Sequence, residues 1–302
     1  MKNKNAISLT RTDKIFQIST RIFLAVLLVI TLYPVLFVVL ASVSDPTYVN
    51  SGALLLFPRG FHLTGYQFVI RDDRILTGYI NTLIYAGGSV FMGLLFSLPA
   101  GYALSRKDLG GRGFIMAFMV FTMFFSGGLI PAFINVRNLG LFDTRAIIII
   151  LGSVSVWNII LIRTFFQSSI PDSLHDAAQI DGCGDAKFFT QIVLPLSKAI
   201  VAVIALFIAV GQWNSFFTPL IFLQNRDLLP LQNILRQIIL VAAAVNVAEE
   251  GAIAGDMGLD QAIFNQVIRY AVIVVSTIPI ICLYPFLQKY FVQGVMIGSL
   301  KE

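Results

Sequence analysis

Long apolar stretches without a single Asp, Glu, Lys or Arg alternate along this chain with shorter segments that hold the charges. Six such stretches are long enough, or nearly so, for a helix to cross a hydrocarbon core of about 30 Å at about 1.5 Å per residue. The alternating pattern of a membrane β-strand is absent, and a chain in lipid must satisfy its own backbone, so the pattern predicts helices. The predicted fold is all-α and integral to the membrane, with six transmembrane helices at 22–43, 81–105, 113–136, 146–162, 199–225 and 270–288.

Composition supports the same class. Hydrophobic residues make up 57% of the chain and charged residues 12%, with a mean hydropathy of +0.83, whereas soluble domains carry roughly 25% charged residues. A chain of 302 residues cannot enclose that much apolar surface in one core, so the excess must face lipid. We expect an N-terminal segment at 1–21, a six-helix transmembrane domain at 22–290 and a tail at 291–302. The first apolar stretch has no small-residue cleavage pattern after it, so we expect it to remain as a span.

The distribution of Lys and Arg among the loops predicts how the chain is oriented in the membrane. With the N-terminus inside the cell, 13 of the 21 Lys and Arg residues fall on the cytoplasmic side and 8 on the other, and every Lys is inside. The positive-inside rule therefore favours both termini in the cytoplasm of a bacterial cell, in a multi-pass protein of the cell membrane. The segment 228–248 could be a seventh span, but Arg236 interrupts it. A re-entrant or surface amphipathic helix is favoured there.

The longest interior loop, 163–198, is the segment with the most information. It contains IPDSLHDAAQIDGCGDAKFFTQIVLPLSK. Pro171 and the acidic residues after it predict a helix start, and Gly182 predicts its stop. A second short helix fits 185–193, ending before Pro195. Leu174, Ala177 and Ala178 would share one face of the first helix, and small side chains would let another protein approach closely.

This loop resembles the cytoplasmic signature of the permease subunits of ABC importers, in which EAA is followed at fixed offsets by Gly and by Ile-x-Leu-Pro. Asp176-Ala177-Ala178, Gly182 and Ile192-x-Leu194-Pro195 stand at the matching offsets. Asp176 replaces the usual Glu and Cys183 an often observed Ala. The runs GQWNSFFTPLIF and QKYFVQGVMIGSLKE are similar to the shorter permease partner of maltose-type systems, and the segment around 43–69 to a Gram-positive branch that handles complex oligosaccharides.

The resemblance implies a role and partners. The loop would be a coupling helix that docks on an ATPase subunit through Asp176, Ala177, Ala178, Asp181 and Gly182. The partners would be a second homologous permease, two ATPase subunits and an extracellular substrate-binding protein, with ATP and Mg on the ATPase subunits and no cofactor on this chain. The chain has no GxxxxGK[ST] phosphate loop, in agreement with ATP hydrolysis elsewhere. The alternative for the loop is an ordinary interfacial amphipathic helix.

Polar residues inside predicted spans are candidates for a sugar path, because polar groups at membrane depth are costly. An indole packs on a sugar ring and a side-chain amide bonds its hydroxyls. The competing interpretation is that the amides form hydrogen bonds between helices and the tryptophans fill the bundle. The candidates are Trp157, Asn158, Gln212, Trp213 and Asn214.

Two other functions are alternatives for a chain of this composition. An ion-coupled secondary transporter usually needs a carboxylate at membrane depth, and all 16 Asp and Glu residues lie outside the predicted spans. An intramembrane enzyme is disfavoured because no HExxH pair and no nucleophile beside a His base occurs.

His62 and His175 are isolated and suggest no metal site. Glu249, Glu250, Asp256 and Asp260 make one outer loop acidic, either as a solvated loop or as a docking surface for a binding protein. The sequence does not indicate which sugar is carried.

Overall fold

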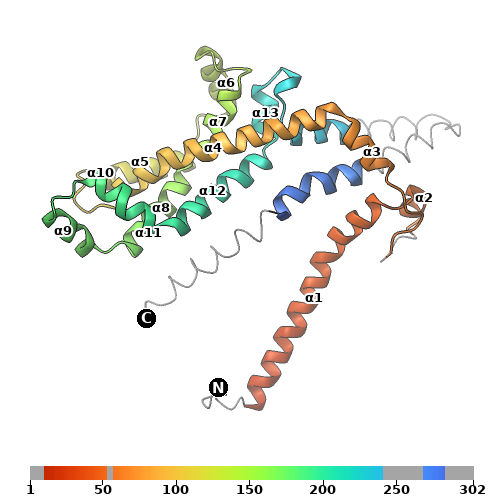
Figure 1. Ribbon diagram of the computed structural model, residues 1–302, viewed down its shortest axis with the longest axis horizontal. Helices are drawn as coiled ribbons and strands as arrows, with labels where there is room; N and C mark the ends of the chain where they lie inside the picture. The colour runs from red at the N-terminus through yellow and green to blue at the C-terminus, as the bar shows by residue number, and fades with distance from the viewer. Residues whose placement is uncertain (1–9, 53–56, 241–267, 283–302) are drawn as a thin grey trace. The chain divides into compact units, whose positions relative to one another are not determined.

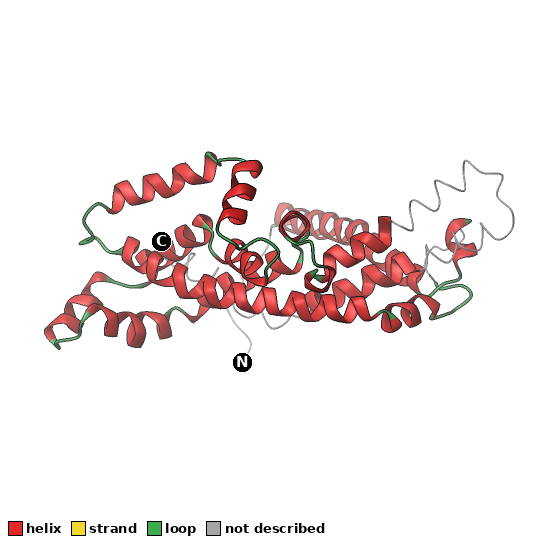
Figure 2. Ribbon diagram, turned by 90° about the horizontal axis from the view of Figure 1, so that it is seen from above, coloured by secondary structure: helices red, strands yellow, loops and turns green. Residues whose placement is uncertain are grey.

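The structure, a computed structural model, describes residues 10–52, 57–240 and 268–282. Within these ranges the chain forms helices and no strand (Figure 2), which confirms the all-α prediction. The transmembrane candidates and their neighbours are α1 (Arg11–Ser42), α4 (Asp73–Ser105), α5 (Arg112–Phe124), α6 (Leu129–Asn138), α7 (Arg145–Ser153), α8 (Val156–Ser169), α12 (Lys198–Trp213), α13 (Phe217–Phe222) and a helix at Ile268–Cys282.

The chain divides into two compact units, and the first comprises residues 1–71 and 239–275. Its helix α1 begins with a capping box, in which the Thr10 hydroxyl accepts from the Asp13 backbone N–H at 3.2 Å and the Asp13 carboxylate accepts from the Thr10 N–H at 3.0 Å. After α1, the short helices α2 (Pro46–Asn50) and α3 (Thr64–Arg71) follow. The Ser42 and Tyr66 hydroxyls share a hydrogen bond of 2.7 Å that ties α3 to the end of α1.

The second unit comprises residues 72–238 and 276–302 and is organised around α4, which contacts α7, α8 and α12 (Figure 1). Two glycines of α4 allow this close packing. A Cβ at Gly93 would lie 2.5 Å from the carbonyl oxygen of Ser153, and one at Gly101 would lie 2.4 Å from a methyl carbon of Ile162. Both distances are too short for a side chain, so glycine is required where the helices cross.

The predicted spans correspond to continuous helices in two cases and to broken helices in three. Helices α1 and α4 are each long and apolar enough to cross a membrane. The predicted span 113–136 is divided into α5 and α6, which meet at 110° across residues 125–128. The predicted span 146–162 bends by 42° between α7 and α8. Within the predicted span 199–225, helix α12 ends at Trp213 and α13 follows after a short break.

Residues 231–240 form a helix whose apolar face is buried, as Leu231, Ile234 and Leu235 are at most 4% exposed while Arg236 is exposed. This agrees with the predicted amphipathic helix. The Leu231 backbone N–H donates to the Thr82 hydroxyl of α4 at 2.9 Å. Four parts of the chain discussed above lie outside the described residues: 241–248, the acidic residues 249, 250, 256 and 260, residues 283–288 of the last predicted span, and the tail 291–302.

Candidate functional site

The loop between α8 and α12 contains a helix that ends in a defined turn. Helix α9 (Asp172–Ile180) starts after Pro171 and has Asp172 in its first turn, as predicted. At its end the Gly182 N–H donates to the Gln179 carbonyl at 3.0 Å and the Cys183 N–H to the Ala178 carbonyl at 2.8 Å. These two bonds form a Schellman motif with Gly182 in the left-handed region, at φ +73°. Glycine at this offset is therefore explained by the backbone turn itself.

The segment after this turn stays helical further than expected. Helix α10 (Asp185–Phe188) continues as a π-helical stretch, Phe189–Val193, and then as α11 (Leu194–Leu196). Pro195 therefore does not stop the helix before it. Pro195 instead occupies the first turn of α11, where the missing N–H costs little. The break comes at Ser197, where the helix turns by 81° into α12.

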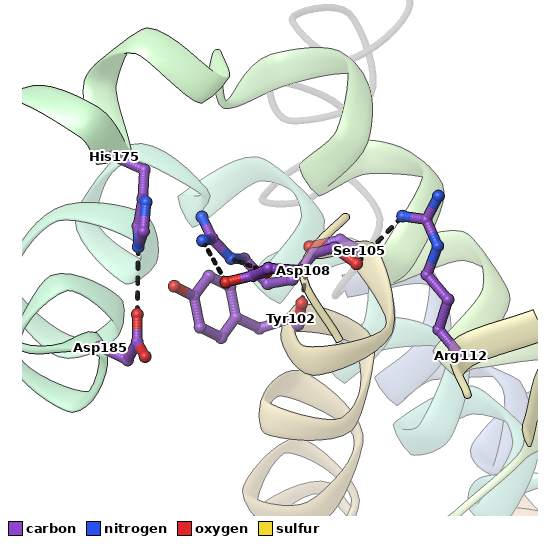
Figure 3. A network of polar contacts seen from close by, with 7 residues as sticks. Tyr102, Ser105, Asp108, Arg112, His175 and Asp185 are labelled. Atoms are coloured by element: carbon purple, nitrogen blue, oxygen red, sulfur yellow. Dashed lines mark hydrogen bonds and ion pairs between the residues drawn. The ribbon is translucent and has the colours of Figure 1, made fainter. Parts of the chain in front are cut away.

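One face of α9 is buried against its own loop. His175 and Ala178 are 4% and 8% exposed, and Leu174 packs beside the same core. The His175 ring meets Phe188 edge-on, with centroids 5.0 Å apart, and its Nε2 lies 3.0 Å from an Asp185 carboxylate oxygen (Figure 3). The sequence shows His175 as isolated, whereas the fold brings it to Asp185. A spacing of ten residues across a helix–turn–helix was the available signal for this contact.

The opposite face of α9 is open. Asp176, Ala177, Asp181 and Gly182 are exposed, and the Ile180 side chain is 87% exposed. The sequence motif thus divides between two surfaces, because Ala178 packs inward while Ala177 points outward. An apolar side chain surrounded by two carboxylates at the tip of a loop is a surface suited to protein contact.

The loop is fastened to the end of α4 by several contacts. The Lys107 ammonium lies 2.6 Å from the Asp172 carboxylate, and the Arg163 guanidinium donates to the Leu104 carbonyl at 3.1 Å. The Tyr102 ring lies 5.0 Å from that of Phe189. The hydrogen bond from Lys107 lowers the pKa of Asp172 below its usual value.

These contacts surround a cavity of about 310 Å³, with Tyr102, Arg112 and His175 among its lining residues. Figure 3 shows Tyr102 and Ser105 of α4 between the His175–Asp185 pair and Arg112. Helix α9 and the segment after it are therefore connected to the end of α4 by side-chain contacts.

A second cavity, of about 410 Å³, lies where α7 and α8 meet the end of α12. Three of the five candidate path residues line it, namely Trp157, Asn158 and Gln212. Ser155 and Thr218 also line it and were missed, because only the breaks after α7 and α12 bring them there. Asn158 is 7% exposed, and its side chain makes no hydrogen bond with another described residue.

Gln212 is held by helix contacts. Its amide nitrogen donates to the Ser89 hydroxyl at 2.7 Å and to the Ile148 carbonyl at 2.9 Å, which joins α12 to α4 and α7. Its side chain also lies flat against Gly152, where a Cβ would approach the amide nitrogen to 2.0 Å. This geometry favours the interhelical role over contact with a substrate.

The remaining two candidates do not line the cavity. Trp213 is 5% exposed, and its indole N–H donates to the Ser276 carbonyl at 3.1 Å. The Asn214 amide donates to the Val210 carbonyl of its own helix at 2.9 Å. Within the described ranges no group of three or more His, Cys, Asp or Glu side chains could hold a metal ion.

Residues 90–297, which include both the loop and the second cavity, match the family described as binding-protein-dependent transport system inner membrane component. The chain belongs to this family. It is 38% identical over 96% of its length to the polygalacturonan/rhamnogalacturonan transport system permease protein YtcP of Bacillus subtilis, of which it covers 99%. It is 27% identical to the arabinooligosaccharides transport system permease protein AraQ of Halalkalibacterium halodurans, over 96% of this chain and 99% of that one.

A solved structure supports the same assignment. A chain from the crystal structure of a bacterial ABC transporter involved in the import of the acidic polysaccharide alginate superimposes with a TM-score of 0.82. It is 32% identical, and the match covers 95% of this chain and 100% of that one. The resemblance to ABC importer permeases is therefore confirmed, and the chain is a membrane permease. Membership in this family favours an ATP-driven importer over an ion-coupled transporter, and the family comprises transport permeases rather than enzymes.

Proposed function

We propose that this chain is the permease subunit of an importer for oligosaccharides. Its relatives include permeases named for polygalacturonan/rhamnogalacturonan and for arabinooligosaccharides, and the matching structure belongs to an alginate importer. Two of these three names refer to polymers of sugar acids, so oligosaccharides of acidic polysaccharides are the first substrates to test. The chain spans almost the full length of these relatives, which supports carrying over the function of the whole subunit.

The main support for this function is that α9, in the 163–198 loop, has one exposed face and one face packed against the protein. Helix α9 exposes Asp176, Ala177, Ile180 and Asp181 on one side, and its other side is packed on the loop and tied to α4. To transmit a movement, a helix needs one exposed face that a partner can bind and firm contacts to the rest of the chain on its other face. Helix α9 has both. In this proposal the ATPase subunit binds the exposed face, while Ala178 and Gly182 maintain the shape of this helix.

The proposed topology has six crossings, with both termini and the 163–198 loop in the cytoplasm. The broken pairs α5–α6 and α7–α8 each count as one crossing, and α12 and the helix at Ile268–Cys282 provide the last two. The excess of Lys and Arg on the proposed inner side supports this orientation.

The proposed assembly contains this chain, a second homologous permease, two ATPase subunits and an external binding protein that delivers the sugar. ATP and Mg bind the ATPase subunits, and this chain needs no cofactor. Closure of the ATPase pair would move α9, and α4 would follow through Lys107, Tyr102 and Arg163. The spans would then alternate between inward-open and outward-open states.

Within the membrane, the cavity lined by Trp157 and Asn158 is the proposed point of contact with sugar. The Asn158 amide is free to bond a hydroxyl, and the Trp157 indole is 54% exposed and offers an apolar face to a sugar ring. Gln212, Trp213 and Asn214 have the helix contacts described above, so we assign them to the bundle.

The test is reconstitution of the complete importer in liposomes, with ATP supplied and ion gradients collapsed. Uptake of a labelled oligogalacturonate is measured beside that of a neutral arabino-oligosaccharide. Asp176→Lys should reduce uptake and binding-protein-stimulated ATP hydrolysis together by about tenfold, the cost of one interfacial charge contact of about 1.4 kcal/mol. Asp73→Lys makes the same charge change at the exposed start of α4 and should leave both rates unchanged. Normal uptake by the Asp176→Lys importer, or uptake that needs an ion gradient, would contradict the proposal.

A further inference from the structure

Three basic residues meet at the cavity of about 310 Å³ beside α9. Arg106 and Lys107 directly follow the apolar stretch 81–105, and Arg112 directly precedes the apolar stretch 113–136. Asp172 is the only carboxylate among the described residues that line this cavity. Because all three cations stand at the ends of apolar stretches, the cavity lies at the level where these helices leave the membrane.

The charges around the cavity are not balanced within the described part of the chain. The Arg106 guanidinium lies 2.9 Å from the Asp108 carboxylate, and the Lys107 ammonium lies 2.6 Å from that of Asp172. Arg112 has no carboxylate partner among the described residues, and its guanidinium donates to the Arg106 carbonyl at 3.0 Å. The three cations and the two carboxylates bound to them leave one positive charge, which the single negative charge of a phosphodiester would neutralise.

A buried hydroxyl in the same cavity also lacks a partner. Tyr102 lines the cavity, and its hydroxyl oxygen is buried without a hydrogen bond to any described residue. Figure 3 shows the Tyr102 ring between the His175–Asp185 pair and Arg112. A buried hydroxyl without a hydrogen bond is costly, so such groups usually bond a ligand or water. A phosphate oxygen would accept this hydrogen bond, while the fork of N–H groups on Arg112 matches phosphate geometry.

The surroundings of the cavity favour a phospholipid over a soluble phosphate compound. Helix α5 begins at Arg112, and its Phe114, Ile115 and Phe118 side chains are 79%, 42% and 60% exposed. This apolar surface, directly beside the basic residues, suits acyl chains. Basic pockets between transmembrane helices at the membrane surface bind phospholipid headgroups. The cavity volume is at the lower end of the range of about 300–1,000 Å³ for small-molecule sites, which suits a headgroup.

The parts of the chain outside the described residues do not supply the missing anion. The two ends, 1–9 and 283–302, contain Lys2, Lys4, Lys289 and Lys301 against Glu302. The acidic residues 249, 250, 256 and 260 fall in a loop predicted on the other side of the membrane. The exposed face of α9 is itself acidic and lies opposite the face that carries His175, which lines the cavity. The anion therefore comes from outside the chain.

We propose that the cavity lined by Tyr102, Arg106, Lys107 and Arg112 binds the phosphodiester headgroup of an anionic phospholipid, whose acyl chains lie on the exposed apolar side of α5. A lipid bound there joins the ends of α4 and α5 to the start of α9. The inference concerns lipid binding and depends neither on the sugar nor on ATP hydrolysis. Its failure would leave the proposed function standing.

The first test is native mass spectrometry of the complete importer in detergent, titrated with phosphatidylglycerol or with phosphatidylcholine. The tightest bound phosphatidylglycerol should bind about tenfold more strongly than phosphatidylcholine, because the choline cation cancels the phosphate charge. Glycerophosphoglycerol, the same headgroup without acyl chains, should not displace it at equal concentration. Displacement would identify a soluble phosphodiester as the ligand and overturn the lipid assignment, and equal binding of the two lipids would overturn the anion site.

The second test assigns the binding to the cavity. Arg112→Gln should weaken phosphatidylglycerol binding about tenfold, and Tyr102→Phe, which keeps the ring contacts, about threefold. The matched control is Arg137→Gln, at an exposed arginine that follows the other end of the stretch 113–136, and it should leave the affinity unchanged. Equal affinities of the Arg112→Gln and Arg137→Gln importers would overturn the inference. A carboxylate of a partner subunit seated in the cavity of the assembled importer would also overturn it.

Discussion

Replacing Gln212 with leucine separates a structural role from a substrate role. Leucine has nearly the same volume, so the packing against Gly152 is kept while both donors are lost. The two hydrogen bonds, to the Ser89 hydroxyl and the Ile148 carbonyl, join three helices. Interhelical hydrogen bonds in membranes average about 0.6 kcal/mol and reach about 1.7 kcal/mol, so the variant should lose roughly 1 to 3 kcal/mol of stability. At about 2–4 °C per kcal/mol, the midpoint of thermal unfolding should fall by roughly 2 to 12 °C.

The assay is thermal unfolding of the purified importer in detergent, beside the apparent affinity for oligosaccharide uptake in liposomes. Gln212→Leu should lower the unfolding midpoint and leave the uptake affinity within a factor of two. Asn214→Leu is the matched control, because the Asn214 amide has no described partner outside its own helix, and its midpoint should stay near that of the unmodified protein. A double-mutant cycle with Ser89→Ala should give a coupling of about 0.6 to 1.7 kcal/mol. A normal midpoint together with a tenfold change in uptake affinity would mean that Gln212 contacts the substrate and does not stabilise the helix bundle.

Three further predictions concern the loop. Gly182→Ala should destabilise the end of α9 by about 1 kcal/mol, because alanine is strained at a φ of +73°, and faster hydrogen exchange at residues 178–183 should report it, while Gly182→Asn should be milder. His175→Leu removes the bond to Asp185 but keeps an apolar side chain against Phe188, so exchange should increase at 185–188 while α4 stays protected; unchanged exchange there would count against the contact. For Asp172, Lys107 lowers the carboxylate pKa, so the ion pair stabilises the loop at any pH above the usual value of about 3.8 and is lost only as the pH falls through the lowered value. The carboxyl carbon of Asp172 should therefore show no titration of this group between pH 5 and 8 in its NMR chemical shift, and protonation of the Asp172 carboxylate within that range would contradict the assignment.

The sequence predicted those parts of the molecule that local chemistry determines. Charge-free stretches indicate apolar helices whatever they pack against, and α1 and α4 were found this way. Helix α9 was also found, since Pro171 and Gly182 are local start and stop signals. Pro195 was misinterpreted because a proline that stops one helix can equally begin the next, and only the bend at Ser197 decides between the two.

The remaining features depend on contacts between segments far apart in the chain. Hydropathy reports how apolar a stretch is, and it does not report where the helical hydrogen bonds stop, so 113–136 was predicted as one helix although it breaks at 125–128. Gln212 was a candidate for sugar contact because it is a polar residue in a predicted span. Its hydrogen-bond partners lie on α4 and α7, and the sequence does not show how those helices are aligned with α12. Ala177 and Ala178 are neighbours in the motif, yet a rotation of about 100° per residue turns one outward and the other inward.

In the proposed function, the exposed face of α9 binds an ATP-hydrolysing subunit. The most direct measurement places p-benzoyl-phenylalanine at position 180, where the isoleucine side chain is 87% exposed, and irradiates the complete importer in native membranes with and without ATP. We expect a crosslink to the ATPase subunit whose yield changes with ATP. A crosslink to the external binding protein, or a complete importer in which position 180 joins no ATPase subunit, would contradict it.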